Sequence, residues 1–279
     1  QQGRMTALNP DGQEIWAKTV DGYAEWPPFV WDIDQDGGGE IVLCLNSNLV
    51  LCLDAGDGRE EWRYRVAGDD VMMVTPVAAD VDNDGEYEVV LTGPDGDLYV
   101  LSHKGKKEWR FRKPTQGLVR FGLPIGDIDG DSHLETCFMD DELVYCLDLY
   151  DRSIEWTFKP ETPNHYSNYN TFADVTGDGE IDVLIVAPCL YVLSNKGVHL
   201  ASFDTAKLVR NDRALSGMWS GDLNGDGLVE ILVKFEGDGL YCLSTGSPYK
   251  AEDMVWPKCL LNLENRPVVP TEGTDEPEV

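Results

Sequence analysis

A short acidic string recurs five times in this chain at a nearly constant interval. Its first copy, DIDQDGGGE, runs from Asp32 to Glu40, and the later copies begin at residues 80, 127, 174 and 222. The steps are therefore 48, 47, 47 and 48 residues. An aromatic residue keeps the same interval, at Trp16, Trp62, Trp109, Trp156, Phe203 and Trp256. A fixed interval of this length is typical of repeat architectures in which each repeat forms one structural unit.

Residues 75–113 show what one repeat builds. Short apolar runs at 75–81 and 87–92 flank the acidic string, a third run spans 98–101, and residues 108–112 alternate polar with aromatic side chains. Such runs predict strands, and the Gly and Pro residues between them predict turns. No stretch shows the apolar period of a helix. Four antiparallel strands in each repeat predict an all-β fold, a β-propeller of four-stranded blades.

We predict one propeller domain over residues 1–270, with about six blades, and an acidic flexible tail at 271–279. The complete blades are expected at 27–66, 75–113, 121–159, 168–204 and 217–258, with an N-terminal half blade at 4–19. Two alternatives remain for the half blade. Either residues near 266–269 return to complete it and close the ring, or further blades precede it in a longer chain.

The acidic strings predict Ca²⁺ sites in the loops between the first and second strands of each blade, up to five ions in all. Oxygen ligands at positions 1, 3, 5, 7 and 9 converge on one point, position 7 through its backbone carbonyl, and Ca²⁺ prefers such ligands. The expected ligands are Asp32, Asp34, Asp36, Gly38, Glu40, Asp80, Asp82, Asp84, Glu86, Glu88, Asp127, Asp129, Asp131, His133, Glu135, Asp174, Thr176, Asp178, Glu180, Asp182, Asp222, Asn224, Asp226, Leu228 and Glu230.

Two of the five loops depart from this pattern. The third places Ser132 at position 6, where a Gly relieves the strain of a positive φ. The fourth has Thr176 at position 3 and the shorter Asp182 at position 9. The fourth loop is therefore expected to bind Ca²⁺ most weakly.

Two strings, FGLPIGDIDGD at 121–131 and DGEIDVLIVAP at 178–188, resemble the Phe-Gly and Gly-Ala-Pro ends of FG-GAP repeats. Such repeats, of the FG-GAP or VCBS type, are known from integrin α-subunit propellers and from secreted bacterial proteins. The resemblance covers nearly the whole chain from Trp26 to Trp256 and implies calcium in the loop between the first two strands of each blade. Most repeats here lack the Phe-Gly pair, so the ligand recognition of integrins is not implied.

Composition narrows the partners and the location. With 51 acidic and 22 basic residues, the formal net charge of −29 has the wrong sign for binding nucleic acid. No run approaches the ~20 apolar residues of a membrane span, so no membrane insertion is expected. Because cytosolic Ca²⁺ would hardly fill such open sites, we expect an extracellular or periplasmic protein, as a monomeric domain of a larger chain.

The loops that precede the inner strands predict a ligand-binding rim. Its expected residues are Trp26, Arg120, His165, Tyr166, Asn168, Tyr169, Arg210 and Arg213. Aromatic faces, amides and guanidinium groups suit a polysaccharide or a cell-surface protein, so we predict a binding module for one of these. The alternative is a rhamnogalacturonan-like uronate lyase, since calcium-rich propellers are known among such enzymes. In a lyase, Arg120 or Arg210 would neutralise the uronate carboxylate, and His165 or Tyr166 would abstract the proton.

Overall fold

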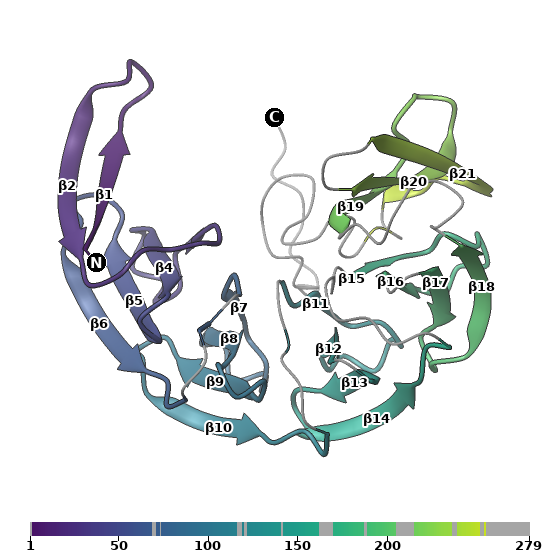
Figure 1. Ribbon diagram of the computed structural model, residues 1–279, viewed down its shortest axis with the longest axis horizontal. Helices are drawn as coiled ribbons and strands as arrows, with labels where there is room; N and C mark the ends of the chain where they lie inside the picture. Colours follow the sequence, from purple (N-terminus) through teal and green to yellow (C-terminus); the bar gives the residue numbers. More distant parts are fainter. Residues whose placement is uncertain are drawn as a thin grey trace.

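The computed structural model describes residues 2–68, 71–72, 74–115, 119, 122–140, 142–161, 170–186, 189–204, 215–235, 239–251 and 254. The described residues form 21 strands in six antiparallel sheets, which lie along an arc (Figure 1). This arrangement confirms the predicted all-β propeller of four-stranded units.

Four sheets have four strands each, which pair in chain order. The first sheet contains β3 (Phe29–Trp31), β4 (Glu40–Leu45), β5 (Leu49–Asp54) and β6 (Glu60–Arg65). The second contains β7 (Val77–Ala79), β8 (Glu88–Thr92), β9 (Leu98–Ser102) and β10 (Lys107–Phe111). The third contains β11 (Ile125–Gly126), β12 (Glu135–Met139), β13 (Val144–Asp148) and β14 (Ser153–Phe158). The fourth contains β15 (Asn170–Ala173), β16 (Asp182–Val186), β17 (Cys189–Ser194) and β18 (His199–Asp204).

The two ends of the arc differ from this plan. The N-terminal end is a hairpin of β1 (Gly3–Leu8) and β2 (Glu14–Val20), which corresponds to the expected half blade. The other end has three strands, β19 (Leu215–Gly221), β20 (Leu228–Phe235) and β21 (Leu240–Pro248). The sequence predicts a complete blade over 217–258, whereas the described residues of that repeat supply three strands.

Burial follows the position of each strand in its sheet. Inner strands such as β8, β12 and β13 are buried along their whole length because neighbouring sheets cover both of their faces, whereas β21, the third strand of the last sheet, is mostly half-buried or exposed. The fourth strand β6 alternates between half-buried and exposed side chains, as expected for a strand at the outer edge. The hairpin packs on the first sheet, where Met5 and Trp16 contact a cluster that includes Leu43 and Leu51.

The recurring tryptophans lie between neighbouring sheets. Three glycines with φ between +71° and +72°, in turns between third and fourth strands, each face the indole of the preceding repeat: Gly58 faces Trp16, Gly105 faces Trp62 and Gly197 faces Trp156. A Cβ atom on any of these glycines would lie 2.5–2.6 Å from the indole. In the third repeat Arg152 takes the place of the glycine, and its guanidinium lies over Trp109, 5.4 Å from the ring centroid.

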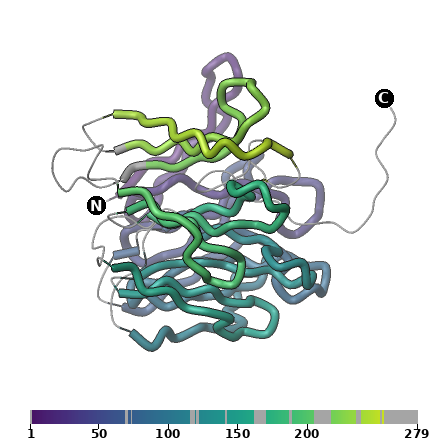
Figure 2. The backbone as a smooth tube through the Cα atoms, turned by 90° about the vertical axis from the view of Figure 1, so that its right-hand side faces the viewer, coloured from purple at the N-terminus to yellow at the C-terminus, as the bar shows by residue number. Residues whose placement is uncertain are grey.

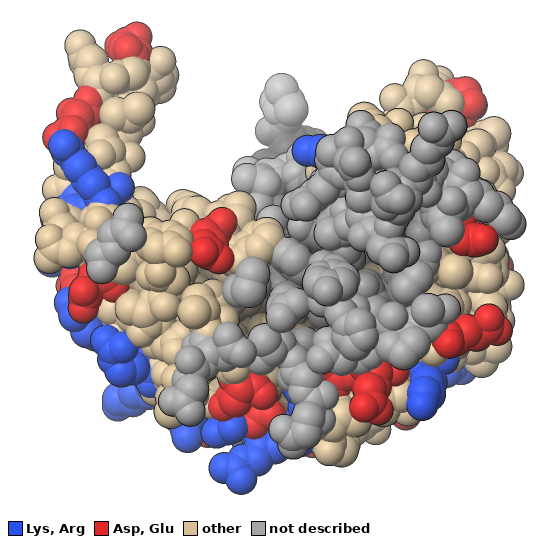
Figure 3. Space-filling view, in the orientation of Figure 1, with Lys and Arg blue, Asp and Glu red and all other residues tan. Residues whose placement is uncertain are grey.

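Antiparallel order places the loops on two opposite edges of the sheets (Figure 2). One edge carries the loops between first and second strands and between third and fourth strands, and we call it the acidic rim. The opposite edge carries the connections from one sheet to the next. Charged side chains of both signs lie along the outer edge of the face shown in Figure 3. In the described part of the chain, no helix has the length and apolar character that a membrane crossing requires.

Candidate functional site

The five acidic loops share one hydrogen-bonded frame on the acidic rim. In each loop, the N–H of position 6 donates to the carboxylate of position 1 over 2.9–3.0 Å. The N–H of position 7 donates to the carboxylate of position 5 over 2.7–2.9 Å. The acid at position 9 accepts the N–H of position 2 over 2.8–3.0 Å. The loop sequence therefore fixes its own backbone, which holds the acidic side chains in the same arrangement in every repeat.

Two positions of each loop have a positive φ. Position 6 is a Gly in four loops, and in the third loop Ser132 has a φ of 73°, which confirms the expected strain. Position 4 also has a positive φ, a feature that the sequence analysis missed. At this position Gln35 donates from Nε2 to the carbonyl of Gly85 in the next loop over 2.6 Å, and Asn83 donates to the carbonyl of Ser132 over 3.3 Å. These bonds link the first three loops into a row.

Carboxylate oxygens converge in at least three of the loops. The converging sets are Asp32, Asp34 and Asp36; Asp80, Asp82 and Glu88; and Asp127, Asp129 and Glu135. Within each set, the ligand atoms lie within 4.8 Å of one another. Two oxygens that each lie about 2.4 Å from one Ca²⁺ ion can be at most that far apart, so each set matches a single coordination sphere.

The acid at position 9 lies at the buried base of its loop. Burial raises the pKa of Glu40 to about 7, of Glu88 to about 8 and of Glu135 to about 9, and it raises the pKa of Asp182 to about 6. For the three glutamates, the negative charge of neighbouring carboxylates adds to this effect. Without a cation, these groups are difficult to ionise, and a bound cation would reverse that preference.

Glu135 has a buried oxygen atom without a partner. Its side chain is fully buried, and Oε2 accepts the N–H of Ile128. Oε1 has no hydrogen-bond partner among the described residues. Asp82 has a similar buried Oδ1. A buried carboxylate oxygen that lacks a donor is costly, and a cation is the natural partner in a site that otherwise contains acids.

The fourth and fifth loops satisfy more of their oxygens internally. In the fourth, Asp182 Oδ2 accepts from the backbone N–H groups of both Val175 and Thr176. In the fifth, the amide of Asn224 donates to Asp226 and to Glu230, over 3.1 and 3.2 Å. That amide would have to turn its oxygen inward to ligate a cation. The expectation that the fourth loop binds most weakly stays a prediction.

A second row of acids, which the sequence motifs did not indicate, lies beneath the loops. Glu61, Glu108 and Glu155 each precede a recurring tryptophan on the fourth strand, and they repeat at intervals of 47 residues. Burial raises the pKa of each, and the position 3 aspartate of the adjacent loop contributes to the shift. Because these glutamates repeat at the same interval as the tryptophans, the sequence contained a signal that could have identified them.

Most of the predicted ligand rim lies outside the described residues. This is true of Arg120, His165, Tyr166, Asn168, Tyr169, Arg210 and Arg213. Trp26 is described and is partly buried. The described residues therefore do not test the binding rim or the catalytic candidates of the lyase.

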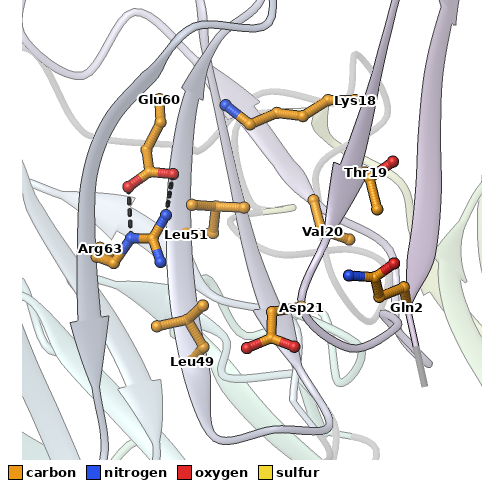
Figure 4. Close-up of a pocket in the computed structure, with 9 residues that line it drawn as sticks. All are labelled: Gln2, Lys18, Thr19, Val20, Asp21, Leu49, Leu51, Glu60 and Arg63. Atoms are coloured by element: carbon orange, nitrogen blue, oxygen red, sulfur yellow. Dashed lines mark hydrogen bonds and ion pairs between the residues drawn. The ribbon is translucent and has the colours of Figure 1, made fainter.

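A small pocket of about 170 Å³ lies between the hairpin and the first sheet (Figure 4). Lys18 and Val20 of β2 face Leu49 and Leu51 of β5 across it. The ion pair between Arg63 and Glu60 lies along one side. With these contents it is a packing gap between two sheets, and it contains no arrangement of nucleophile and base.

Comparison with known proteins identifies the wider family. Residues 1–244 match the family model described as outer membrane protein assembly factor BamB. BamB of Burkholderia pseudomallei (strain K96243) is 29% identical over 101 residues, which are 36% of this chain and 24% of that protein. The match thus spans about a quarter of the length of this curated relative.

Solved structures agree on the fold. The Vibrio cholerae biofilm matrix protein Bap1 matches with a TM-score of 0.61 and 22% identity, over 88% of this chain and 42% of that one. Sqt1 of Saccharomyces cerevisiae matches with a TM-score of 0.62 and 10% identity, over 87% of this chain and 66% of that one. At these identities, the similarity shows a shared fold alone.

These findings correct two predictions. The FG-GAP resemblance is wrong, because the family match extends over residues 1–244, whereas the resemblance depended on short strings around the loops. The predicted function, a calcium-stabilised module for carbohydrate or a surface protein, and the alternative of a lyase are wrong for the same reason. A family named for outer membrane assembly agrees with a location outside the cytoplasm. Calcium binding by the loops stays a prediction.

Proposed function

Since the chain belongs to the family of the outer membrane protein assembly factor BamB, we propose that it is a protein-binding scaffold in outer membrane protein assembly. The observation that carries this proposal is the family match over residues 1–244, which includes all five acidic loops and almost every described strand. A propeller suits this role because its packed sheets hold many loops in fixed positions at two edges.

We propose the periplasm as its location. The relative's name refers to the assembly of outer membrane proteins, and a factor with that role would meet its clients on the inner side of that membrane. The acidic surface supports this proposal, since a net charge of −29 keeps a protein soluble and disfavours adhesion to anionic lipid.

We propose in addition that the five loops bind Ca²⁺ and stiffen the acidic rim. The shared frame, the converging carboxylates and the unpartnered Oε1 of Glu135 support this cofactor. Contacts between loops, such as that from Gln35 to Gly85, would let an ion in one repeat restrain the next. Calcium would then stabilise the scaffold and take no part in chemistry.

The scaffold proposal is tested by direct binding. The purified chain, with Ca²⁺ present, is mixed with a purified outer membrane protein assembly complex and analysed by size-exclusion chromatography and by titration. We expect co-elution and saturable binding in the micromolar range or tighter, near −8 kcal/mol or stronger. Separate elution, with no binding at about 100 μM, would contradict the proposal.

The calcium proposal is tested separately by thermal unfolding with EDTA, Ca²⁺ or Mg²⁺. Each occupied site adds about 2.7 kcal/mol when the free ion concentration is 100 times its Kd. We therefore expect a large rise in Tm with Ca²⁺ and a small one with Mg²⁺, which prefers fewer protein ligands. An identical Tm in EDTA and Ca²⁺ would contradict the cofactor and leave the scaffold proposal in place.

A further inference from the structure

A second group of carboxylates lies beneath the acidic loop of the third sheet. Glu135 begins β12 and pairs directly with Asp148 at the end of β13, and Glu155 lies beside them on β14. Their ligand atoms lie within 4.8 Å of one another. This group shares Glu135 with the loop set of Asp127 and Asp129, so the two sets adjoin.

When all of its members are ionised, the combined group carries more negative charge than one divalent cation balances. The two sets together contain five carboxylates, with a formal charge of −5 when all are ionised. A single Ca²⁺ would leave −3, and a second would leave −1. Glu135 is fully buried and Asp148 is 4% exposed, so water screens their repulsion poorly. The unpartnered Oε1 of Glu135 indicates that the protein alone does not satisfy this group.

The first sheet contains a corresponding trio of carboxylates, two of which are bridged by an arginine. Glu40 pairs with Asp54, and Glu61 precedes Trp62, as their counterparts do in the third sheet. There, Arg59 Nη2 lies 3.6 Å from Asp54 Oδ2 and 3.5 Å from Glu61 Oε1. A guanidinium thus bridges two members of the trio.

The third sheet lacks this arginine. Ser153 lies two residues before Glu155, at the position that Arg59 occupies in the first sheet. Asp148 instead accepts a backbone N–H from Asp151 over 2.6 Å, and its Oδ2 lies 3.1 Å from His133 Nδ1. These contacts fix the orientation of Asp148, as hydrogen bonds to a metal ligand commonly do. Among the described residues, no lysine or arginine forms an ion pair with Glu135 or Glu155.

We propose that the third sheet binds a second divalent cation, ligated by Glu135, Asp148 and Glu155. This cation would occupy the position that corresponds to the Arg59 guanidinium in the first sheet. The all-oxygen ligand set suits a hard cation of the Ca²⁺ class. The second sheet cannot form this site, because Ser102 replaces the aspartate beside Glu88. The fourth and fifth sheets cannot form it either, since Ser194 pairs with Asp182 and Ser244 pairs with Glu230. The site is therefore specific to one repeat and goes beyond the five loop sites.

The experiment counts bound Ca²⁺ by equilibrium dialysis of the full chain, with Ca²⁺ as the probe. Ser153→Arg places an arginine in the third sheet at the position that Arg59 has in the first sheet. Glu155→Gln removes one carboxylate ligand. We expect each variant to bind one ion fewer than the wild type, and Ser153→Arg to unfold at a higher Tm than the wild type in EDTA. Glu108→Gln, the matched change in the second sheet, should leave the number of ions unchanged.

Three outcomes overturn the second site. The first is that Ser153→Arg and Glu155→Gln both bind as many ions as the wild type. The second is that Glu108→Gln also loses one ion. The third is that Glu155→Gln binds Ca²⁺ more weakly but loses no ion, which would make Glu155 an extra ligand of the loop ion. Asp80→Asn tests the loop proposal independently, because it changes a loop that has no second trio. If Asp80→Asn loses no ion while Ser153→Arg does, the loop proposal fails and the second site stands.

Discussion

Replacing Gly105 with Ala tests how neighbouring sheets pack. Gly105 has a φ of +71°, and a Cβ there would lie 2.5 Å from Cδ2 and Cε3 of Trp62. The left-handed conformation costs an Ala about 1–2 kcal/mol, and displacing an indole from a packed interface adds about 1–3 kcal/mol. We therefore expect the free energy of unfolding to fall by about 2–5 kcal/mol in total.

Gly12→Ala is the matched control for this change. Gly12 has a φ of +80° in the hairpin turn, and nothing lies within 4 Å of a Cβ built there. It should lose only the conformational part, about 1–2 kcal/mol. Both variants are measured by guanidinium unfolding with Ca²⁺ present, followed by tryptophan fluorescence and by circular dichroism to test for a single transition. If Gly105→Ala is no less stable than Gly12→Ala, the tryptophans do not lock the sheets as described.

Three further predictions concern buried or strained groups. In EDTA, the free energy of unfolding should fall as pH rises from about 4.5 towards 9, because Glu40, Glu88 and Glu135 in the folded protein keep protons that the unfolded chain releases. Tm measured against pH checks this, and a Tm that rises over this range would contradict it. Ser132→Gly should raise the free energy of unfolding by about 0.5–1 kcal/mol by relieving its φ of 73°, whereas a loss in urea unfolding would show that the serine side chain is needed. Lys113→Met should cost about 3–5 kcal/mol, because it leaves buried Asp140 without the ammonium 3.4 Å away; an unchanged urea midpoint would contradict this.

The conformation of the acidic loops is predictable from sequence because their geometry is local. Within nine residues, the carboxylates at positions 1, 5 and 9 accept backbone N–H groups of the same loop, so the string determines its own conformation. The strain at Ser132 followed from the same pattern. The propeller fold was predictable for a related reason, since each repeat contains its own strand and turn signals.

The second carboxylate trio could not be predicted in this way. Asp148 comes next to Glu135 only through the register of β12 and β13, and Glu155 is the extra residue at the bulge where the pairing of β13 and β14 shifts. Register and bulges depend on how whole strands pack, which a local string does not encode. The same limit explains the wrong family prediction, because a loop motif of nine residues says little about the rest of a propeller.

The measurement that tests the scaffold role most directly is the amount of folded outer membrane protein in cells that lack the gene. Folded and unfolded β-barrel proteins are separated by their gel mobility with and without heating. The account predicts a smaller folded fraction without the gene, and recovery when the full-length gene is returned. Equal folded fractions in both strains would contradict a role in outer membrane protein assembly.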